Sequence, residues 1–163
     1  MYKRQILLGH FAQDCDIIDG IEKEVIGSAV YYGAFPLKAI GVNVALVTKL
    51  AKKDFPLLAV FKEADIPVFA CETTETTGIR NIYSLDDPDN RQSYYMRFAG
   101  SFQERDFPNI KAKVIHIASL MQKEVPVTMI KKLSEMALLS IDVQGFMRTK
   151  VKEGTRLALE NWK

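Results

Sequence analysis

The sequence has few cysteines and no long hydrophobic run. Its two cysteines, Cys15 and Cys71, lie far apart in a chain of 163 residues. They argue against a disulfide-stabilised scaffold and fit a reducing compartment. The longest apolar runs, residues 55–61 and 136–141, are far shorter than the roughly 20 residues of a membrane-spanning helix. We therefore expect a cytoplasmic protein without a membrane partner.

An excess of charge of one sign is also missing. The chain carries 22 basic and 20 acidic residues, a formal net charge of +2. Its first five residues, MYKRQ, match the translation of a transposon end used in sequencing libraries, so we interpret residues 1–5 as a non-native scar. Without Lys3 and Arg4 the balance is 20 − 20 = 0, and net charge gives no reason to expect nucleic acid as a partner. A genuine basic start is the alternative.

Several common catalytic signatures do not occur. The sequence contains no GxxxxGK[ST], GxGxxG, HExxH or GxSxG motif, which removes the usual P-loop, dinucleotide-binding, zinc-protease and serine-hydrolase interpretations. The cysteines lack the spacing of metal ligands, and His116 lies between isoleucines, a position typical of a core histidine. The sequence therefore predicts no metal site in this chain.

What the sequence does contain is an alternation of buried strands and helices. Residues 6–163 are expected to form one α/β domain, with a Rossmann-like, mainly parallel sheet and helices on both faces. After residue 148 the sequence predicts no further strand. Apolar, often β-branched runs predict strands at 6–8, 42–48, 66–70, 113–119 and 138–142, and helical periodicity predicts helices at 29–40, 55–64 and 126–136.

Two further segments predict hairpins. Asp19-Gly20 between short apolar runs predicts one at about residues 16–27, and residues 79–99 alternate with a period of two around the turn DDPDN. Alternating polarity leaves one face of the second hairpin in water, so its strands are expected to stand off the main sheet as a small antiparallel β lid. The alternative is a dimer surface, because tyrosines such as Tyr94 and Tyr95 are favoured in interfaces.

Polar and small residues follow the first predicted strand and precede the first predicted helix. Asp14 and Asp16 come soon after the strand that ends at Gly9, and open α/β sheets bind ligands where such strands end. A carboxylate there can accept paired hydrogen bonds from vicinal hydroxyls. The Gly27-Ser28 turn enters a helix whose first amides would face the same cleft. Taken singly, these positions are better explained by an aspartate in a turn and by an ordinary helix N-cap.

In this order, the features resemble the amino-terminal half of a ribokinase-like, PfkB-family carbohydrate kinase. The family opens with a strand that ends in a G-x-x-x-x-D pattern, here Gly9 to Asp14, followed by a lid hairpin and a diglycine turn, here Gly27-Ser28. Later, DNRQSYY resembles the lid turn, KVIHIASL a buried strand, and LLSIDVQGFMR the family's lslDpN-R segment. The resemblance covers nearly all of residues 6–148.

The resemblance implies a phosphotransferase that uses ATP and Mg²⁺ to phosphorylate a hydroxyl of a sugar, polyol or nucleoside-like small molecule. It implies that the substrate is bound by Asp14, Gly27, Ser28, Tyr32 and Arg91. Two of these positions depart from the family. Ser28 stands where the second glycine is usual, and Tyr32 where asparagine is usual.

The family's GAGD-type turn, which carries the catalytic base, does not occur in the sequence, and neither does its nucleotide-binding half. Phosphoryl transfer depends on positioning the acceptor and neutralising charge on the moving group. We therefore expect a truncated kinase whose base lies downstream, with no catalytic residue and no activity in this chain. The alternatives are a non-catalytic polyol-binding module and an oligomerising α/β domain, with a homodimer formed through the lid.

Overall fold

The main sheet has five parallel strands in the order β5-β4-β1-β8-β9. The structure, a computed structural model, describes residues 4–87, 90–151 and 155–161. All five strands predicted from apolar runs are present, so the parallel α/β architecture is confirmed. Their bounds are Arg4–Leu8 (β1), Asn43–Ala51 (β4), Val68–Thr73 (β5), Val114–Ile117 (β8) and Leu138–Ile141 (β9).

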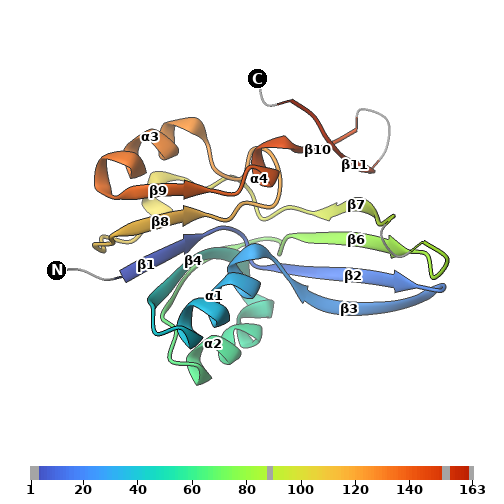
Figure 1. Cartoon of the computed structure of the whole chain (residues 1–163), viewed down its shortest axis with the longest axis horizontal. Helices are drawn as coiled ribbons and strands as arrows, with labels where there is room; N and C mark the ends of the chain where they lie inside the picture. Colours follow the sequence, from blue (N-terminus) through green and yellow to red (C-terminus); the bar gives the residue numbers. More distant parts are fainter. Residues whose placement is uncertain (1–3, 88–89, 152–154, 162–163) are drawn as a thin grey trace.

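Helices cover both faces of this sheet (Figure 1). The helices α1 (Ala29–Ala39) and α2 (Ala59–Glu63) lie on one face, and α3 (Val127–Met136) lies on the other. Strand β1 serves both layers, because Leu7 packs with the first pair of helices while Ile6 and Leu8 pack with α3. Period-two alternation along a fully buried strand therefore builds two apolar cores around one sheet.

The predicted helix at 55–64 is shorter than expected. Its first half lies in a 3₁₀ segment, η1 (Lys52–Leu58), and only α2 is α-helical. Asp54 directly precedes the predicted helix, in the position of an N-cap, but it does not cap a helix in the structure. Asp54 lies inside η1, where its Oδ2 accepts a hydrogen bond from Thr76 Oγ1 at 2.5 Å.

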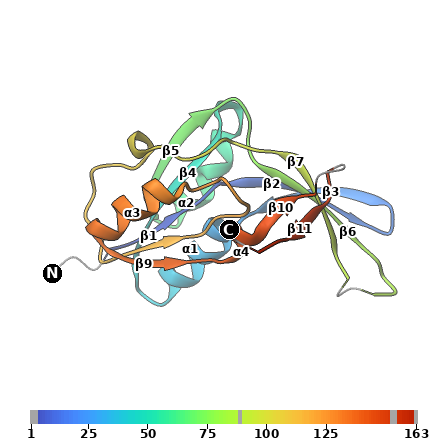
Figure 2. The same cartoon turned by 90° about the horizontal axis from the view of Figure 1, so that it is seen from above.

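Both predicted hairpins are present and together form a second sheet, which we call the lid. Its strands are β2 (Ala12–Ile18), β3 (Ile21–Gly27), β6 (Gly78–Tyr83) and β7 (Gln92–Arg97), in the order β3-β2-β6-β7. Asp19 and Gly20 turn the first hairpin with φ values of 51° and 76°. Figure 2 shows the lid projecting beyond the end of the main sheet.

Two features of the lid were not predicted. The hairpins are joined by parallel pairing of β2 with β6, in a register that puts Asp16 opposite Asn81. In addition, β2 begins at Ala12, four residues before the predicted start. Asp14 is therefore a strand residue of the lid and not part of a loop.

The expectation of no strand after residue 148 is wrong. Strands β10 (Arg148–Lys150) and β11 (Leu157–Leu159) pair antiparallel. Just before β11, Thr155 O accepts a hydrogen bond from Tyr95 N of β7 at 2.6 Å. Strands of three residues carry too weak a local signal to be predicted from sequence. The β10–β11 pair is fixed in addition by its contact with the edge strand β7 of the lid. Two short helical turns, η2 (Glu104–Asp106) and α4 (Gln144–Met147), complete the elements.

The predicted scar is described only in part. Residues 1–3 lie outside the described residues, while Arg4 and Gln5 begin β1, where Gln5 pairs with Val44 and Val114. No helix among the described residues combines the length and apolar character needed to cross a membrane.

Candidate functional site

A cavity of about 220 Å³ opens between the two lid hairpins, the start of α1 and the short helix α4. All five residues predicted to bind a substrate line it: Asp14, Gly27, Ser28, Tyr32 and Arg91. They come from β2, the β3–α1 turn, α1 and the segment directly before β7. The fold thus brings together residues that are as many as 77 positions apart in the sequence (91 − 14 = 77).

Asp14 and Gly27 fit against each other in this cavity. Asp14 Oδ1 accepts a hydrogen bond from Ile79 N at 2.8 Å, which fixes the carboxyl group between the two hairpins. A Cβ added at Gly27 would lie 2.1 Å from Asp14 Oδ2. The position therefore requires glycine, because any side chain would displace the carboxyl group from the turn that enters α1.

The environment of Asp14 raises its pKa to about 6. Burial is the main cause, because it penalises the charged form, and the charge of Asp16 acts in the same direction. The hydrogen bond from Ile79 and the charges of Arg148 and Arg91 oppose the shift. At neutral pH the group is mostly a carboxylate with Oδ2 directed at the cavity wall, and it can accept a hydrogen bond from a ligand hydroxyl.

Ser28 has the backbone conformation of a glycine. Its φ is 103° and its ψ is 150°, a region that L-residues avoid. Its Oγ accepts a hydrogen bond from Tyr31 N at 3.3 Å and so caps α1. One turn further, Tyr32 is 62% exposed, and its hydroxyl donates to Ile26 O at 3.2 Å at the cavity rim.

A polar network on the lid side of the cavity was not foreseen as a unit. Asn81 Nδ2 donates to Asp16 Oδ1 at 3.0 Å, and Ser93 Oγ donates to Asn81 Oδ1 at 2.8 Å. Asp16 and Asn81 both line the cavity. The network depends on the parallel β2–β6 register, for which the sequence carries no signal.

Gln144 and Arg148 line the opposite wall and were also missed as site residues. Asp142 Oδ1 accepts a hydrogen bond from Gln144 N at 2.9 Å, which begins the turn of α4. The available signal was the segment LLSIDVQGFMR, whose resemblance to a family motif includes Asp142 and Arg148. Nothing in that segment indicated that α4 returns to the lid.

A buried polar cluster connects the lid to the main sheet. Glu124 Oε1 accepts from His10 N and Oε2 accepts from Leu120 N, each at 2.7 Å. Leu120 itself lines the cavity. Burial raises the pKa of Glu124 to about 7, and the backbone hydrogen bonds only partly offset it. The carboxyl group therefore holds the segments that follow β1 and β8 to each other.

His10, which is fully buried, carries the connection into the lid. Its Nε2 lies 2.9 Å from Gly100 O, a carbonyl that can only accept, so Nε2 carries the proton. Its Nδ1 is then the acceptor for the Thr77 hydroxyl at 2.8 Å. Desolvation lowers the pKa of His10 to about 3, in agreement with a neutral ring. The 3.8 Å approach of Nδ1 to Glu124 is thus a contact and not an ion pair.

The described residues do not form a metal centre. Within the ranges that the structure describes, no three His, Cys, Asp or Glu side chains converge in a way that could hold an ion. Asp14 and Asp16 share the cavity, but both already accept hydrogen bonds, from Ile79 N and Asn81 Nδ2. We assign no residue of this chain to Mg²⁺.

No protein-family model and no curated protein matches the chain, but solved structures do. A pyrophosphate-dependent kinase in the ribokinase family is 29% identical, with a TM-score of 0.88 over 98% of this chain and 56% of that chain. A second similar structure is 26% identical, with a TM-score of 0.84 over 98% of this chain and 54% of that chain. It is a pyrophosphate-dependent myo-inositol-1 kinase that was converted into a myo-inositol-3 kinase by replacing one asparagine and one serine with leucine. A ribokinase from Cryptococcus neoformans var. grubii serotype A, in complex with ADP, is 12% identical, with a TM-score of 0.67 over 86% and 49%.

The chain therefore has the ribokinase-like fold and resembles the kinases of that family, as the order of its motifs predicted. The ribokinase itself, at 12% identity, shows the fold alone. The chain spans about half the length of these solved chains, from 49% to 56%.

Proposed function

We propose that this chain is the acceptor-binding part of a kinase that phosphorylates a hydroxyl of a sugar, polyol or nucleoside-like small molecule. The observation that carries the proposal is the cavity at Asp14. Five residues singled out from the sequence converge there, and Gly27 is required for the carboxyl group of Asp14 to reach its place. The resemblance to ribokinase-family kinases supplies the reaction class.

Within this range we favour a cyclic polyol of the myo-inositol type. The cavity is small and lined by hydrogen-bonding side chains of both kinds, with Asp14 and Asp16 as acceptors and Arg91, Gln144 and Arg148 as donors. A polyhydroxylated ring presents donors and acceptors all round its edge and fits such a lining. One of the similar structures is a kinase of myo-inositol.

Asn81 and Ser93 are the residues that we propose to select the hydroxyl. In the myo-inositol kinase, the exchanged asparagine and serine are 11 positions apart (89 − 78 = 11). Here Asn81 and Ser93 are 12 apart and hydrogen-bonded across the second lid hairpin. Leucine at position 81 would remove the network to Asp16 and present apolar surface to the acceptor, and leucine at position 93 would remove the hydrogen bond to Asn81. We expect the pair to orient the ring and not to bind the transferred group.

ATP with Mg²⁺ is the donor that the family resemblance implies, and it would act in a longer enzyme. The similar kinases that use pyrophosphate make pyrophosphate a second candidate donor. Neither donor is assigned to a residue of this chain. The 163 residues lack the GAGD-type turn, so we expect binding of the acceptor without turnover.

Isothermal titration calorimetry with myo-inositol tests the proposal. We expect the 163-residue chain to bind it, and Asp14→Asn to weaken binding by about tenfold through loss of a charge-assisted hydrogen bond. Asp19→Asn is the matched control, because it makes the same change at the exposed turn of the same hairpin. Failure of a panel of polyols, sugars and nucleosides to bind would overturn the proposal.

A second experiment separates a kinase from a non-catalytic binding module. The coding sequence downstream of Lys163 should encode a GAGD-type turn, and the longer product should form a polyol phosphate from ATP or pyrophosphate, detected by ³¹P NMR. Acceptor binding by a product without that turn would support the binding module instead.

A homodimer through the lid is a further proposal, which sedimentation of the chain and of a Tyr94→Ser, Tyr95→Ser variant tests.

A further inference from the structure

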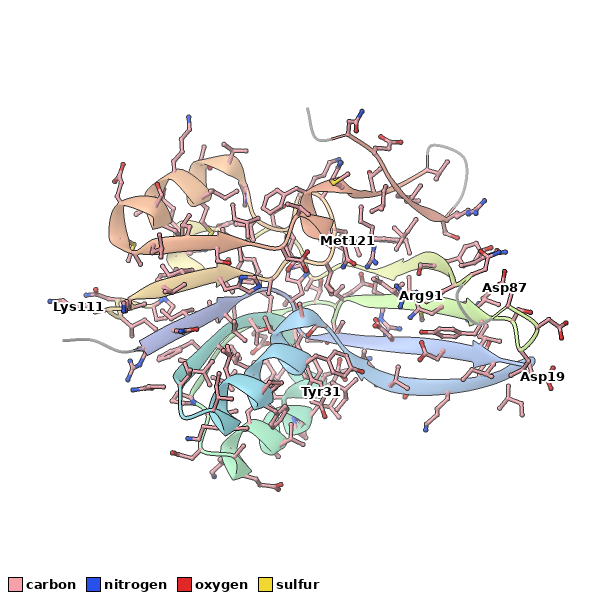
Figure 3. All side chains as sticks on the ribbon, in the orientation of Figure 1. Asp19, Tyr31, Asp87, Arg91, Lys111 and Met121 are labelled. Carbon is pink, nitrogen blue, oxygen red and sulfur yellow. The ribbon has the colours of Figure 1, made fainter. Side chains whose placement is uncertain are left out.

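Two guanidinium groups face the cavity and have no direct partner among the residues that the structure describes. Arg148, the first residue of β10, is half-buried, and Arg91, next to the start of β7, is exposed. Neither side chain makes a hydrogen bond or a direct ion pair within residues 4–87, 90–151 and 155–161. Figure 3 labels Arg91 over the lid strands. The cavity wall therefore carries positive charge that no nearby carboxylate among these residues neutralises by contact.

The electrostatic cost of this arrangement is visible in Arg148. Burial lowers the pKa of its guanidinium, and the like charge of Arg91 lowers it further. Asp14 and Asp142 act in the opposite direction but only from a distance. An anion between the two guanidinium groups would relieve their repulsion, because a guanidinium gains most from a bidentate contact with an anion.

The position of the two arginines indicates where that anion would lie. Arg91, Gln144 and Arg148 also line a second, larger cavity of about 530 Å³, which extends to β11. The same three side chains thus separate the small cavity at Asp14 from this outer space. A ligand whose ring sits against Asp14 would place a substituent of its ring between the arginines.

We propose that Arg91 and Arg148 form a phosphate subsite, which holds the phosphate monoester of a phosphorylated polyol at the boundary between the two cavities. A phosphate has enough oxygens for two guanidinium forks and for the amide of Gln144. A phosphate monoester also carries up to two negative charges, which match the two guanidinium groups, whereas a carboxylate carries one. This inference rests on the proposed function for the polyol and adds the class of its substituent.

The test compares three probes by titration calorimetry on the 163-residue chain: myo-inositol, myo-inositol 1-phosphate and inorganic phosphate. We expect the monophosphate to bind about tenfold more tightly than myo-inositol. Arg148→Met and Arg91→Met should each remove this advantage, so that each variant binds the monophosphate and myo-inositol with affinities within about twofold of each other. Lys150→Met is the control, because it removes a positive charge from the same strand at a residue that lines neither cavity.

The arms also identify the source of the phosphate. If inorganic phosphate binds with the same sensitivity to Arg148→Met and without displacing myo-inositol, the subsite serves a free anion, and the phosphate subsite is still supported. Unchanged affinities of both phosphate probes in both variants would overturn it, even where Asp14→Asn still weakens myo-inositol binding and the proposed function stands. If phosphate binds in an arginine-dependent way but no polyol binds, the phosphate subsite is supported and the proposed function is overturned. Should Arg148→Met fail to fold, Arg91→Met and Arg148→Lys decide the matter.

Discussion

The main sheet and the lid are stabilised by different interactions. In the main sheet, β1 is covered by apolar side chains on both faces, and Ile6 and Leu8 are fully buried. In the lid, the junction of the two hairpins is polar: Arg97 Nη2 donates to Gln13 O at 2.9 Å, and Asp14 and Asp16 accept from Ile79 and Asn81. A sheet held by burial unfolds as a unit, whereas one held by half-exposed hydrogen bonds can open locally at lower cost. The candidate site lies on the lid, the sheet that can open locally at lower cost.

The largest effect is expected from removing the residue that holds the two regions together. Glu124→Ala leaves His10 N and Leu120 N buried without an acceptor. Each buried donor left without an acceptor costs about 1–3 kcal/mol, so the loss of two acceptors should lower the free energy of unfolding by urea by about 2–6 kcal/mol. Glu135→Ala, at an exposed position of α3, is the control. A Glu124→Ala variant as stable as this control would show that burial alone joins the sheets.

The pH dependence of stability tests the same cluster. Glu124 has a pKa of about 7 in the folded chain against 4.5 as its ordinary value. Between these values the unfolded chain loses the proton while the folded chain keeps it, so the contribution of Glu124 to stability falls as pH rises from about 4.5 to 7. His10 acts in the opposite direction, because its pKa is lowered to about 3 and its contribution is lost as pH falls below 6.5.

Comparison with Glu124→Gln separates the two groups. The stability of the wild type relative to this variant should decrease as pH rises through the window of Glu124, as measured by urea unfolding at several pH values. A difference that does not change with pH would contradict the raised pKa of Glu124.

Gly27→Ala should damage the lid and the site together. Its Cβ would lie 2.1 Å from Asp14 Oδ2, so the carboxyl group must move, at a cost of about 1–3 kcal/mol for overpacking. We also expect loss of myo-inositol binding. Gly33→Ala in α1 is the matched control, because its Cβ meets only the flexible end of Leu7 at 3.3 Å. That variant should stay within about 1 kcal/mol of the wild type; equal effects of the two changes would exclude a special role for Gly27.

Arg97→Met should loosen the lid alone. The guanidinium bonds Gln13 O and Thr76 O across the β2–β6 junction, and loss of such bonds costs about 1–3 kcal/mol. In hydrogen exchange, we expect the amide of Gln13 to exchange about tenfold faster, while the amides of β1 and β4 are unchanged. Arg80→Met, which removes only the 3.6 Å pair with Glu22 on the lid surface, should change little. Faster exchange throughout the main sheet would mean that the two sheets are not separate units.

The smallest expected effect is stabilising. Ser28→Gly relieves a φ of 103° at the start of α1, and glycine replaces a serine N-cap at a cost of only a few tenths of a kcal/mol. We expect a net gain of about 1 kcal/mol. Ser28→Ala keeps the strain and loses the hydrogen bond to Tyr31 N, so it should lower stability by a similar amount. Both are measured by urea unfolding, and equal stabilities of the two variants would show that the conformation carries no strain.

Some functional positions could be recognised before the structure because their neighbours in the chain define them. Asp14 follows a strand end, and Gly27-Ser28 precedes a helix that the periodicity of residues 29–40 predicts. Asn81 and Arg148 lack such local definition. They join the site only because β2 pairs with β6 and α4 returns toward the lid, and both contacts join residues that are distant in sequence.

The amino-acid pattern by itself determined most strands, the approximate places of the three longer helical segments and the turn of the first hairpin. Burial on two faces gives a periodic pattern, and Asp19-Gly20 is a local signal for a tight turn. The tertiary structure decided how the hairpins join, that β10 and β11 pair beyond residue 147, and which side chains share the cavity. Strand pairing and the meeting of polar groups depend on hydrogen bonds between distant backbone and side-chain atoms, whose partners no short stretch of sequence specifies.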